Sequence, residues 1–248
     1  LFKKIKPWGI ILFSRNIKNK LQLKDLVKEI KKNFKDPKYP ILIDEEGGNV
    51  SRLKKIIDLR YFSQNFFGNL YKSDKKLFYT VYKVYIDNVC DLLNKVGINI
   101  NTVPVLDVLN KKNKTFIGCR SFSKNQKVVS KLGKLCIDFY KMNKIATVIK
   151  HIPGHGMVNV DSHYKTPITN KSRKALLKKD FKAFKNCPSL FAMSAHVIFN
   201  KYDSVNTATH SKIIINKIIR NYINFKGILI SDDISMKALK FSIKINTL

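Results

Sequence analysis

Residues 145–163 read IATVIKHIPGHGMVNVDSH, and this stretch is the strongest indication of the fold. It begins with a short apolar run, continues with Lys150 and His151, and then turns to Pro153 and Gly154. An apolar run of this length that ends at turn-forming residues is typical of a buried strand. We therefore expect a strand here, with the Lys-His pair at its C-terminal end.

The same stretch is dense in titratable side chains, with Lys150, His151, His155, Asp161 and His163 within fourteen residues. Asp161 and His163 are two residues apart on the predicted loop, so the carboxylate can accept a hydrogen bond from the imidazole and raise its basicity. A histidine held in this way can exchange protons near neutral pH. A loop of merely solvated polar groups is the alternative, but the density of the cluster favours a site.

The rest of the chain alternates between apolar runs and segments with helical spacing. The other predicted strands cover residues 8–13, 40–43, 98–103, 189–193 and 227–230. The predicted helices cover residues 21–34, 71–95, 126–143, 171–185 and 211–224. Polar residues follow the strands, which is typical of parallel α/β proteins, either a (β/α)8 barrel or a doubly wound sheet. No G-x-G-x-x-G motif follows a strand, which argues against a dinucleotide-binding fold.

The composition fits one globular domain of barrel size, with 248 residues of which 44% are hydrophobic. The net charge of +31 is extreme, but the lysines are spread through every segment and aromatics do not interleave with arginines. We interpret the charge as a lysine-rich composition and expect no nucleic-acid partner. No apolar run approaches about 18 residues, so no membrane partner is expected. The cysteines lack C-x-x-C spacing, which predicts free thiols in a reducing compartment; they are Cys90, Cys119, Cys136 and Cys187.

Five motifs follow one another along the chain: PWGIILFSRN (7–16), IDEEGGNVSRL (43–53), KHIPGHG (150–156), DSH (161–163) and SDDISM (231–236). In this order they resemble the β-N-acetylhexosaminidases of glycoside hydrolase family 3. The resemblance implies that residues 1–248 form a single catalytic (β/α)8 barrel domain of the TIM type. Six strand candidates are visible, whereas closing such a barrel takes about eight. We therefore expect a fragment that lacks the first and last strands.

The resemblance further implies a retaining exo-β-N-acetylglucosaminidase of the bacterial single-domain type. Such enzymes remove terminal GlcNAc from muropeptides during peptidoglycan recycling in the cytoplasm. The same family contains other β-glycosidases and phosphorylases, so hydrolysis and phosphorolysis both stay open. We expect a monomer that acts on a carbohydrate substrate without a cofactor.

Catalysis is expected at two places in the chain. Asp232 follows the predicted strand 227–230, and a carboxylate at the C-terminal end of a barrel strand points into the mouth. The resemblance implies that Asp232 is the nucleophile, which forms a covalent glycosyl-enzyme. It also implies that His163 replaces the usual second carboxylic acid as acid/base, and that Asp161 orients His163. The alternative is that Asp232 or Asp233 caps the helix expected from Ser235, and both interpretations hold if Asp233 is the capping residue.

The resemblance assigns sugar binding in the first subsite to five residues: Asp44, Arg52, Arg120, Lys150 and His151. Carboxylate, guanidinium and ammonium groups together suit vicinal hydroxyls. Asn49 stands where the family has a further arginine, which leaves the role of that position open. The alternative is that Asp44 and Lys150 form a structural ion pair and that Arg120 anchors a loop, because ion-pair networks imitate sites.

Two other classes of function compete with a glycosidase. A metallohydrolase would use His151, His155 and His163, but Pro153 and Gly154 interrupt the helix that histidines four apart would need. A polyanion-binding module would use the net charge. We rank both below the glycosidase and predict no metal site.

Overall fold

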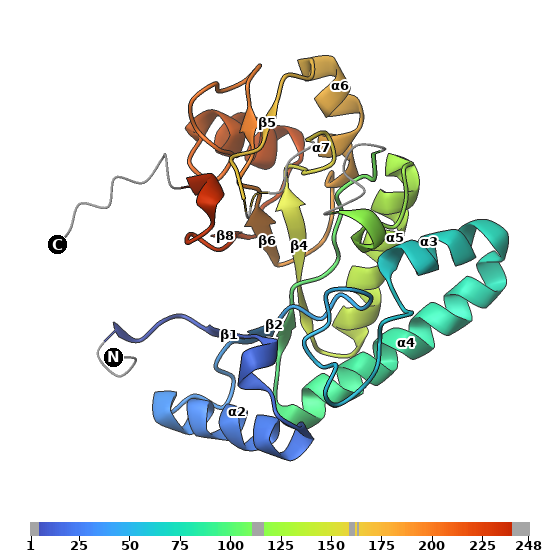
Figure 1. The fold of residues 1–248 in the computed structure, drawn as a ribbon, viewed down its shortest axis with the longest axis vertical. Helices are drawn as coiled ribbons and strands as arrows, with labels where there is room; N and C mark the ends of the chain where they lie inside the picture. The colour runs from blue at the N-terminus through green and yellow to red at the C-terminus, as the bar shows by residue number, and fades with distance from the viewer. Residues whose placement is uncertain (1–4, 111–116, 159–161, 163, 240–248) are drawn as a thin grey trace.

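The computed structural model describes residues 5–110, 117–158, 162 and 164–239. Within this part of the chain, six parallel strands form one sheet in the order β1-β2-β3-β4-β6-β8 (Figure 1). They are β1 (Ile10–Leu12), β2 (Ile41–Ile43), β3 (Ile100–Asn101), β4 (Ala146–Ile152), β6 (Phe191–Ser194) and β8 (Ile228–Ser231). Each overlaps an apolar run that the sequence predicts as a strand, and the predicted parallel α/β fold is confirmed.

The sheet is strongly curved. Trp8, just before β1, packs against Phe191 of β6 with ring centroids 5.3 Å apart, although β1 and β6 are the first and fifth strands of the sheet. In a flat sheet, strands four positions apart would lie roughly 19 Å from each other. The sheet is therefore a half-barrel with β1 and β8 at its two ends, and the predicted barrel-type fold is confirmed.

Alternate residues of the strands belong to two different apolar clusters. Leu42, Val148 and Met193 pack together on the inner side of the curved sheet. Ile43 and Ile149, their neighbours in sequence, belong to the larger core on the outer side, where the helices lie. This is the two-residue period of strands that are buried on both faces.

Helices cover the outer side of the sheet. Three long ones, α2 (Lys20–Phe34), α4 (Lys75–Val96) and α5 (Gln126–Met142), lie side by side in chain order (Figure 1). Asn19 caps α2 by accepting a hydrogen bond from Gln22 N at 2.9 Å, as N-cap residues do. The remaining helical elements are α3 (Gln64–Ser73), α6 (Arg173–Lys178), α7 (Asp180–Ala183), the π-helical η3 (Ile214–Tyr222) and the 3₁₀ turns η1 (Ser14–Asn16), η2 (Gly118–Arg120) and η4 (Lys237–Leu239).

Two helix predictions are wrong in their continuity. The predicted helix 71–95 is broken at Asp74, which is extended and caps α4 by accepting from Leu77 N at 2.9 Å. The predicted helix 171–185 is broken at Lys179, which leaves helical geometry between α6 and α7. A second, two-stranded parallel sheet, β5 (Ile168–Thr169) with β7 (Ile198–Phe199), was not predicted, because strands of two residues show no period.

The four cysteines are free, three of them buried, as the sequence predicts. Among the described residues, no helix has both the length and the apolar character needed to cross a membrane.

Candidate active site

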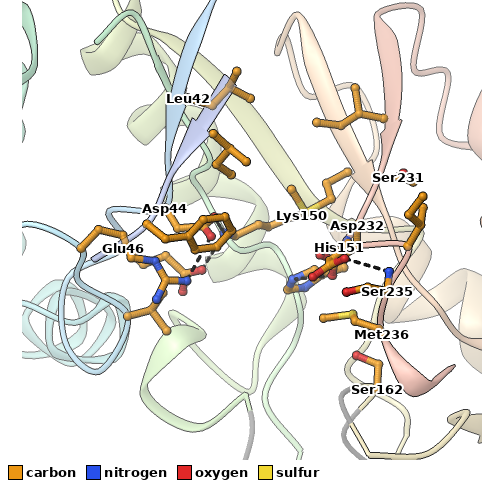
Figure 2. A pocket seen from close by; sticks show the side chains of 18 of the residues that line it. Leu42, Asp44, Glu46, Lys150, His151, Ser162, Ser231, Asp232, Ser235 and Met236 are labelled. Atoms are coloured by element: carbon orange, nitrogen blue, oxygen red, sulfur yellow. Dashed lines mark hydrogen bonds and ion pairs between the residues drawn. The ribbon is translucent and has the colours of Figure 1, made fainter. Parts of the chain in front are cut away.

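The strand period places three predicted site residues at one end of the half-barrel. Asp44, Lys150 and Asp232 each come two residues after an inward-facing residue: Leu42, Val148 and Ile230. Because the strands are parallel, their C-terminal ends meet at the same rim. A pocket of about 890 Å³ opens there, with Asp44 and Glu46 on one side, Asp232 on the other, and Lys150 and His151 between them (Figure 2). All the described residues that the sequence assigns to the site line this pocket.

Lys150 is the centre of a buried ionic network. Its Nζ lies 3.0 Å from Asp44 Oδ1, 2.6 Å from Glu46 Oε1 and 2.9 Å from Thr102 Oγ1. The residue is only 2% exposed. Burial lowers the pKa of Lys150, but the charges of Asp44 and Glu46 outweigh this effect and leave the pKa above its ordinary value. The ammonium group is therefore charged and rigidly aimed at the base of the pocket.

Two arginines complete this network. Arg52 Nη2 donates to Asp44 Oδ2 at 3.1 Å. Arg120 forms a two-pronged pair with Glu46, with Nε and Nη2 at 2.8 and 2.9 Å from its oxygens. Burial raises the pKa of Glu46, but Arg120 and Lys150 more than offset it, so the pKa falls to about 2. The pKa of Asp44 is likewise held well below its usual range: burial raises it, and Lys150, a hydrogen bond from the Thr102 hydroxyl and Arg52 lower it further.

Glu46 was not predicted as a site residue, although it lies in the same motif as Asp44. Glu46 pairs with Arg120 and Lys150, which lie far from it in sequence. No local spacing of residues indicates these pairs. Glu45, between the two, has a different task. Its Oε2 accepts from Ser51 Oγ and from two backbone amides of the following loop, so it holds that loop in place.

His151 is held between two carboxylates. Its Nδ1 lies 2.6 Å from Asp107 Oδ2, and its Nε2 lies 3.9 Å from Asp232 Oδ2. Asp107 is fully buried and also accepts from His155 N at 2.7 Å. The hydrogen bond between Nδ1 and Asp107 fixes the orientation of the imidazole ring. Nε2, on the other side of the ring, therefore faces the pocket. Asp107 was not predicted either; the only signal was its place soon after the strand at residues 98–103.

Asp232 faces the pocket with 19% of its side chain exposed. Its Oδ1 accepts from the N–H of Asp233 at 2.8 Å, which leaves Oδ2 toward His151. Asp233 Oδ1 accepts from Ser235 N at 2.8 Å within the turn that follows β8, and the helix expected from Ser235 is replaced by this turn and the 3₁₀ turn η4. His196 was not predicted as a site residue. Its Nδ1 is hydrogen-bonded to Thr209 Oγ1, and its Nε2 lies 3.1 Å from the carbonyl oxygen of Asp233. It supports the turn that presents Asp232.

Asp161 and His163, the predicted orienting residue and acid/base, lie outside the described residues. Ser162, between them in sequence, is buried and lines the pocket. His151 and His155 have ring centroids 6.0 Å apart. Burial lowers the pKa of His155 to about 4, so its imidazole is neutral at pH 7. Among the described side chains, no three His, Cys, Asp or Glu residues are arranged to hold a metal ion.

Lys150→Met should destabilise the fold strongly, because it leaves two buried carboxylates with one cation fewer. Removing one partner of a buried ionic group costs about 3–5 kcal/mol. Lys83→Met is the matched control, since Lys83 pairs with Asp87 at an exposed i,i+4 position, where such pairs contribute about 0.5 kcal/mol or less. Urea unfolding of both variants measures the difference. Equal free energies of unfolding would mean that the network is not the structural base of the pocket.

Comparisons with known proteins identify the family of the chain. The model of the glycosyl hydrolase family 3 N terminal domain matches residues 2–246. The chain is 34% identical over 237 residues to a beta-hexosaminidase of Actinobacillus pleuropneumoniae serotype 5b (strain L20), covering 94% of this chain and 67% of that protein. It is 31% identical to a beta-hexosaminidase of Haemophilus influenzae (strain ATCC 51907 / DSM 11121 / KW20 / Rd), covering 92% and 64%.

Two solved structures are similar to the half-barrel. NagZ from Neisseria gonorrhoeae, in complex with N-trifluoroacetyl-D-glucosamine, matches with a TM-score of 0.83 and 32% identity, over 94% of this chain and 69% of that chain. A glycoside hydrolase family 3 beta-N-acetylglucosaminidase from Paenibacillus sp. str. FPU-7 matches with a TM-score of 0.87 and 27% identity, over 97% of this chain and 46% of that one. The chain thus spans about two thirds of the curated relatives and less than half of the Paenibacillus enzyme.

Proposed function

The chain belongs to glycosyl hydrolase family 3, because residues 2–246 match the N terminal domain of that family. From this premise we propose that the protein is a retaining exo-β-N-acetylglucosaminidase. The observation that supports the proposal best is the arrangement across the pocket. Asp232 stands on one wall, and Asp44, Arg120 and Lys150 form a fixed polar wall opposite. A volume of about 890 Å³ lies within the ordinary range for a small-ligand site. A single sugar ring held by the polar wall would present its anomeric carbon to Asp232.

In the proposed reaction Asp232 attacks the anomeric carbon while His163 donates a proton to the glycosidic oxygen, and the aglycone leaves as an alcohol. Water then attacks the glycosyl-enzyme, His163 takes its proton, and the bond to Asp232 breaks. Two displacements on one carbon retain the β configuration. His151 Nε2, with Nδ1 fixed by Asp107, would bind a sugar hydroxyl beside the nucleophile.

Side chains on the pocket wall support a substrate with an N-acetyl group. Met193, Ile230 and Met236 give the pocket an apolar surface near Asp232, which suits the methyl group of an N-acetyl substituent. The similar Neisseria protein was solved with N-trifluoroacetyl-D-glucosamine. We propose terminal β-linked GlcNAc of muropeptides as the substrate, in cytoplasmic peptidoglycan recycling, with the protein acting as a monomer. Arg52 would contribute through Asp44, whose carboxylate it fixes.

The products of the reaction test this function. A β-linked GlcNAc substrate should give free GlcNAc, whose first-formed anomer in the NMR spectrum is β, at a rate that inorganic phosphate does not change. The matched β-glucoside should react far more slowly. Formation of GlcNAc-1-phosphate would make the protein a phosphorylase, and α-GlcNAc as the first product would exclude the retaining mechanism.

A further inference from the structure

The turn Gly154–Met157, directly after β4, wraps around the carboxylate of Asp180, the first residue of α7. Met157 N donates to Asp180 Oδ2 at 2.8 Å, and the Gly156 N–H also stabilises this carboxylate. Asp180 is only 1% exposed. Gly154 has a φ of +138°, and a Cβ on it would lie 2.7 Å from Asp180 Cβ. The close approach of the turn to Asp180 thus requires glycine at Gly154.

A second buried carboxylate holds the same turn from another element. Asp107, in the loop after β3, accepts from His155 N at 2.7 Å and also contacts His151 Nδ1. The backbone N–H groups of His155 and Met157 therefore donate to two different carboxylates, those of Asp107 and Asp180. This pairing clamps the turn between the loop after β3 and the start of α7. Asp107 contributes to the pocket through His151, whereas Asp180 contacts only the backbone of the turn in the interactions described above.

Ser162 and Thr166, on either side of His163 in sequence, both bond to Ala238. Ala238 N donates to the Ser162 carbonyl at 3.2 Å, and Thr166 Oγ1 donates to the Ala238 carbonyl at 2.8 Å. Ala238 belongs to η4, which follows Asp232 closely in sequence. The predicted proton donor thus follows, in sequence, the turn that Asp180 holds at Met157, and its neighbours Ser162 and Thr166 both bond to Ala238.

We propose that Asp180 is a positioning residue, which anchors the turn that leads from the sugar-binding His151 to the proton donor. The inference rests on the proposed function, which assigns the donor to His163. Asp180 acts through the backbone of the turn and does not itself bind the sugar. Because the turn joins the strand end to the donor, loosening it should impair proton donation more than it impairs nucleophilic attack.

The charges around Asp180 make this anchor dependent on pH. Burial raises the pKa of Asp180 to about 7, the negative charge of Asp107 adds to the rise, and the Met157 and Gly156 amides and Lys179 only partly counter it. His155, within the turn, is neutral at this pH. When the turn opens to water, the pKa of Asp180 returns to about 3.9. Asp180 therefore binds a proton more tightly in the closed turn, and its contribution favours opening as the pH rises toward 7. His155 contributes in the opposite direction, because opening returns its lowered pKa to about 6.5.

Hydrogen exchange of the Met157 amide, followed by NMR, measures the anchor without reference to activity. The ratio of wild-type to Asp180→Asn protection should fall roughly twentyfold between pH 5.5 and 7.5, as linkage predicts for the two pKa values of Asp180, because the contribution of His155 is common to both proteins and cancels. Asp180→Asn keeps an acceptor that cannot ionise, so the pH dependence of its protection reports the other groups of the turn, chiefly His155. The Val148 amide, within β4, serves as the internal reference. The same pH dependence in the wild type and in Asp180→Asn would overturn the proposal.

The catalytic consequence is tested with a pair of variants. Asp180→Ala removes the acceptor and should lower kcat/KM about tenfold for a substrate with a poor leaving group, a part of the 10²–10⁴-fold that general acid catalysis supplies. The kcat/KM for a substrate with a good leaving group should fall much less. Asp180→Asn should restore kcat/KM for both substrates. Asp74→Asn, at the cap of the distant helix α4, is the control and should keep the wild-type ratio between the two substrates.

The outcomes separate this inference from the proposed function. An equal loss on both substrates, or no restoration by Asp180→Asn, would mean that Asp180 is only structural. If Asp180→Ala does not fold, hydrogen exchange in the wild type and in Asp180→Asn still decides. A wild type that releases no sugar from either substrate would refute the proposed function, while the exchange measurement would still decide whether Asp180 anchors the turn.

Discussion

Asp232→Ala should lower kcat by about 10⁴–10⁶-fold, the range found when a catalytic nucleophile is removed. The physical reason is that the neighbouring carboxylate, Asp233, is engaged by the hydrogen bond from Ser235 N and is not placed to replace the nucleophile. KM should change little, because the other groups proposed to bind the sugar, among them Asp44, Arg120 and Lys150, stay in place. Steady-state kinetics on an aryl N-acetylglucosaminide measure both parameters.

Asp233→Asn is the matched control for this variant. It removes a charge from the adjacent residue but keeps the oxygen that accepts from Ser235 N. Its kcat should stay within about tenfold of the wild type, the range of modest positional effects rather than of a lost nucleophile. If the two variants lost activity equally, the carboxylate of Asp232 would have no special part in the reaction.

His163→Ala should separate two classes of substrate. With a natural disaccharide the loss should be about 10²–10⁴-fold, the usual contribution of general acid catalysis. An aryl glycoside with a good leaving group needs little protonation, so its first step should be slowed far less. Azide needs no general base, and adding it should restore turnover of the aryl substrate. Asp161→Asn should show a milder form of the same pattern, since the histidine stays but loses its orienting charge.

A uniform loss would contradict this assignment. If both substrates slowed by one factor and azide had no effect, another group would donate the proton. His151 would then be the next candidate, because it is the histidine that faces Asp232.

The strands, and the positions of the site residues at their C-terminal ends, were predictable because both depend on the local pattern of apolar and polar residues. Apolar runs of strand length mark all six strands, and the polar residue after each run marks where a parallel sheet presents its chemistry. Asp44, Lys150 and Asp232 could be placed in this way, since each follows an inward-facing residue by two positions.

The partners of these residues could not be predicted, because they depend on which strands become neighbours. Glu46 meets Arg120 across 74 positions of sequence, and His151 meets Asp107 across 44. Asp180 lies at the start of a short helix and would look like an ordinary cap residue. Only its burial against the turn Gly154–Met157 indicates a role in the site.

The covalent intermediate itself is the most direct test of the account. A fluorinated N-acetylglucosaminyl fluoride, whose leaving group departs easily but whose glycosyl-enzyme hydrolyses slowly, should trap the intermediate. Mass spectrometry of a proteolytic digest should then find one sugar attached to the peptide that contains Asp232, and none in Asp232→Ala. A label on any other residue, or continued turnover by Asp232→Ala, would contradict the assignment of Asp232 as the nucleophile.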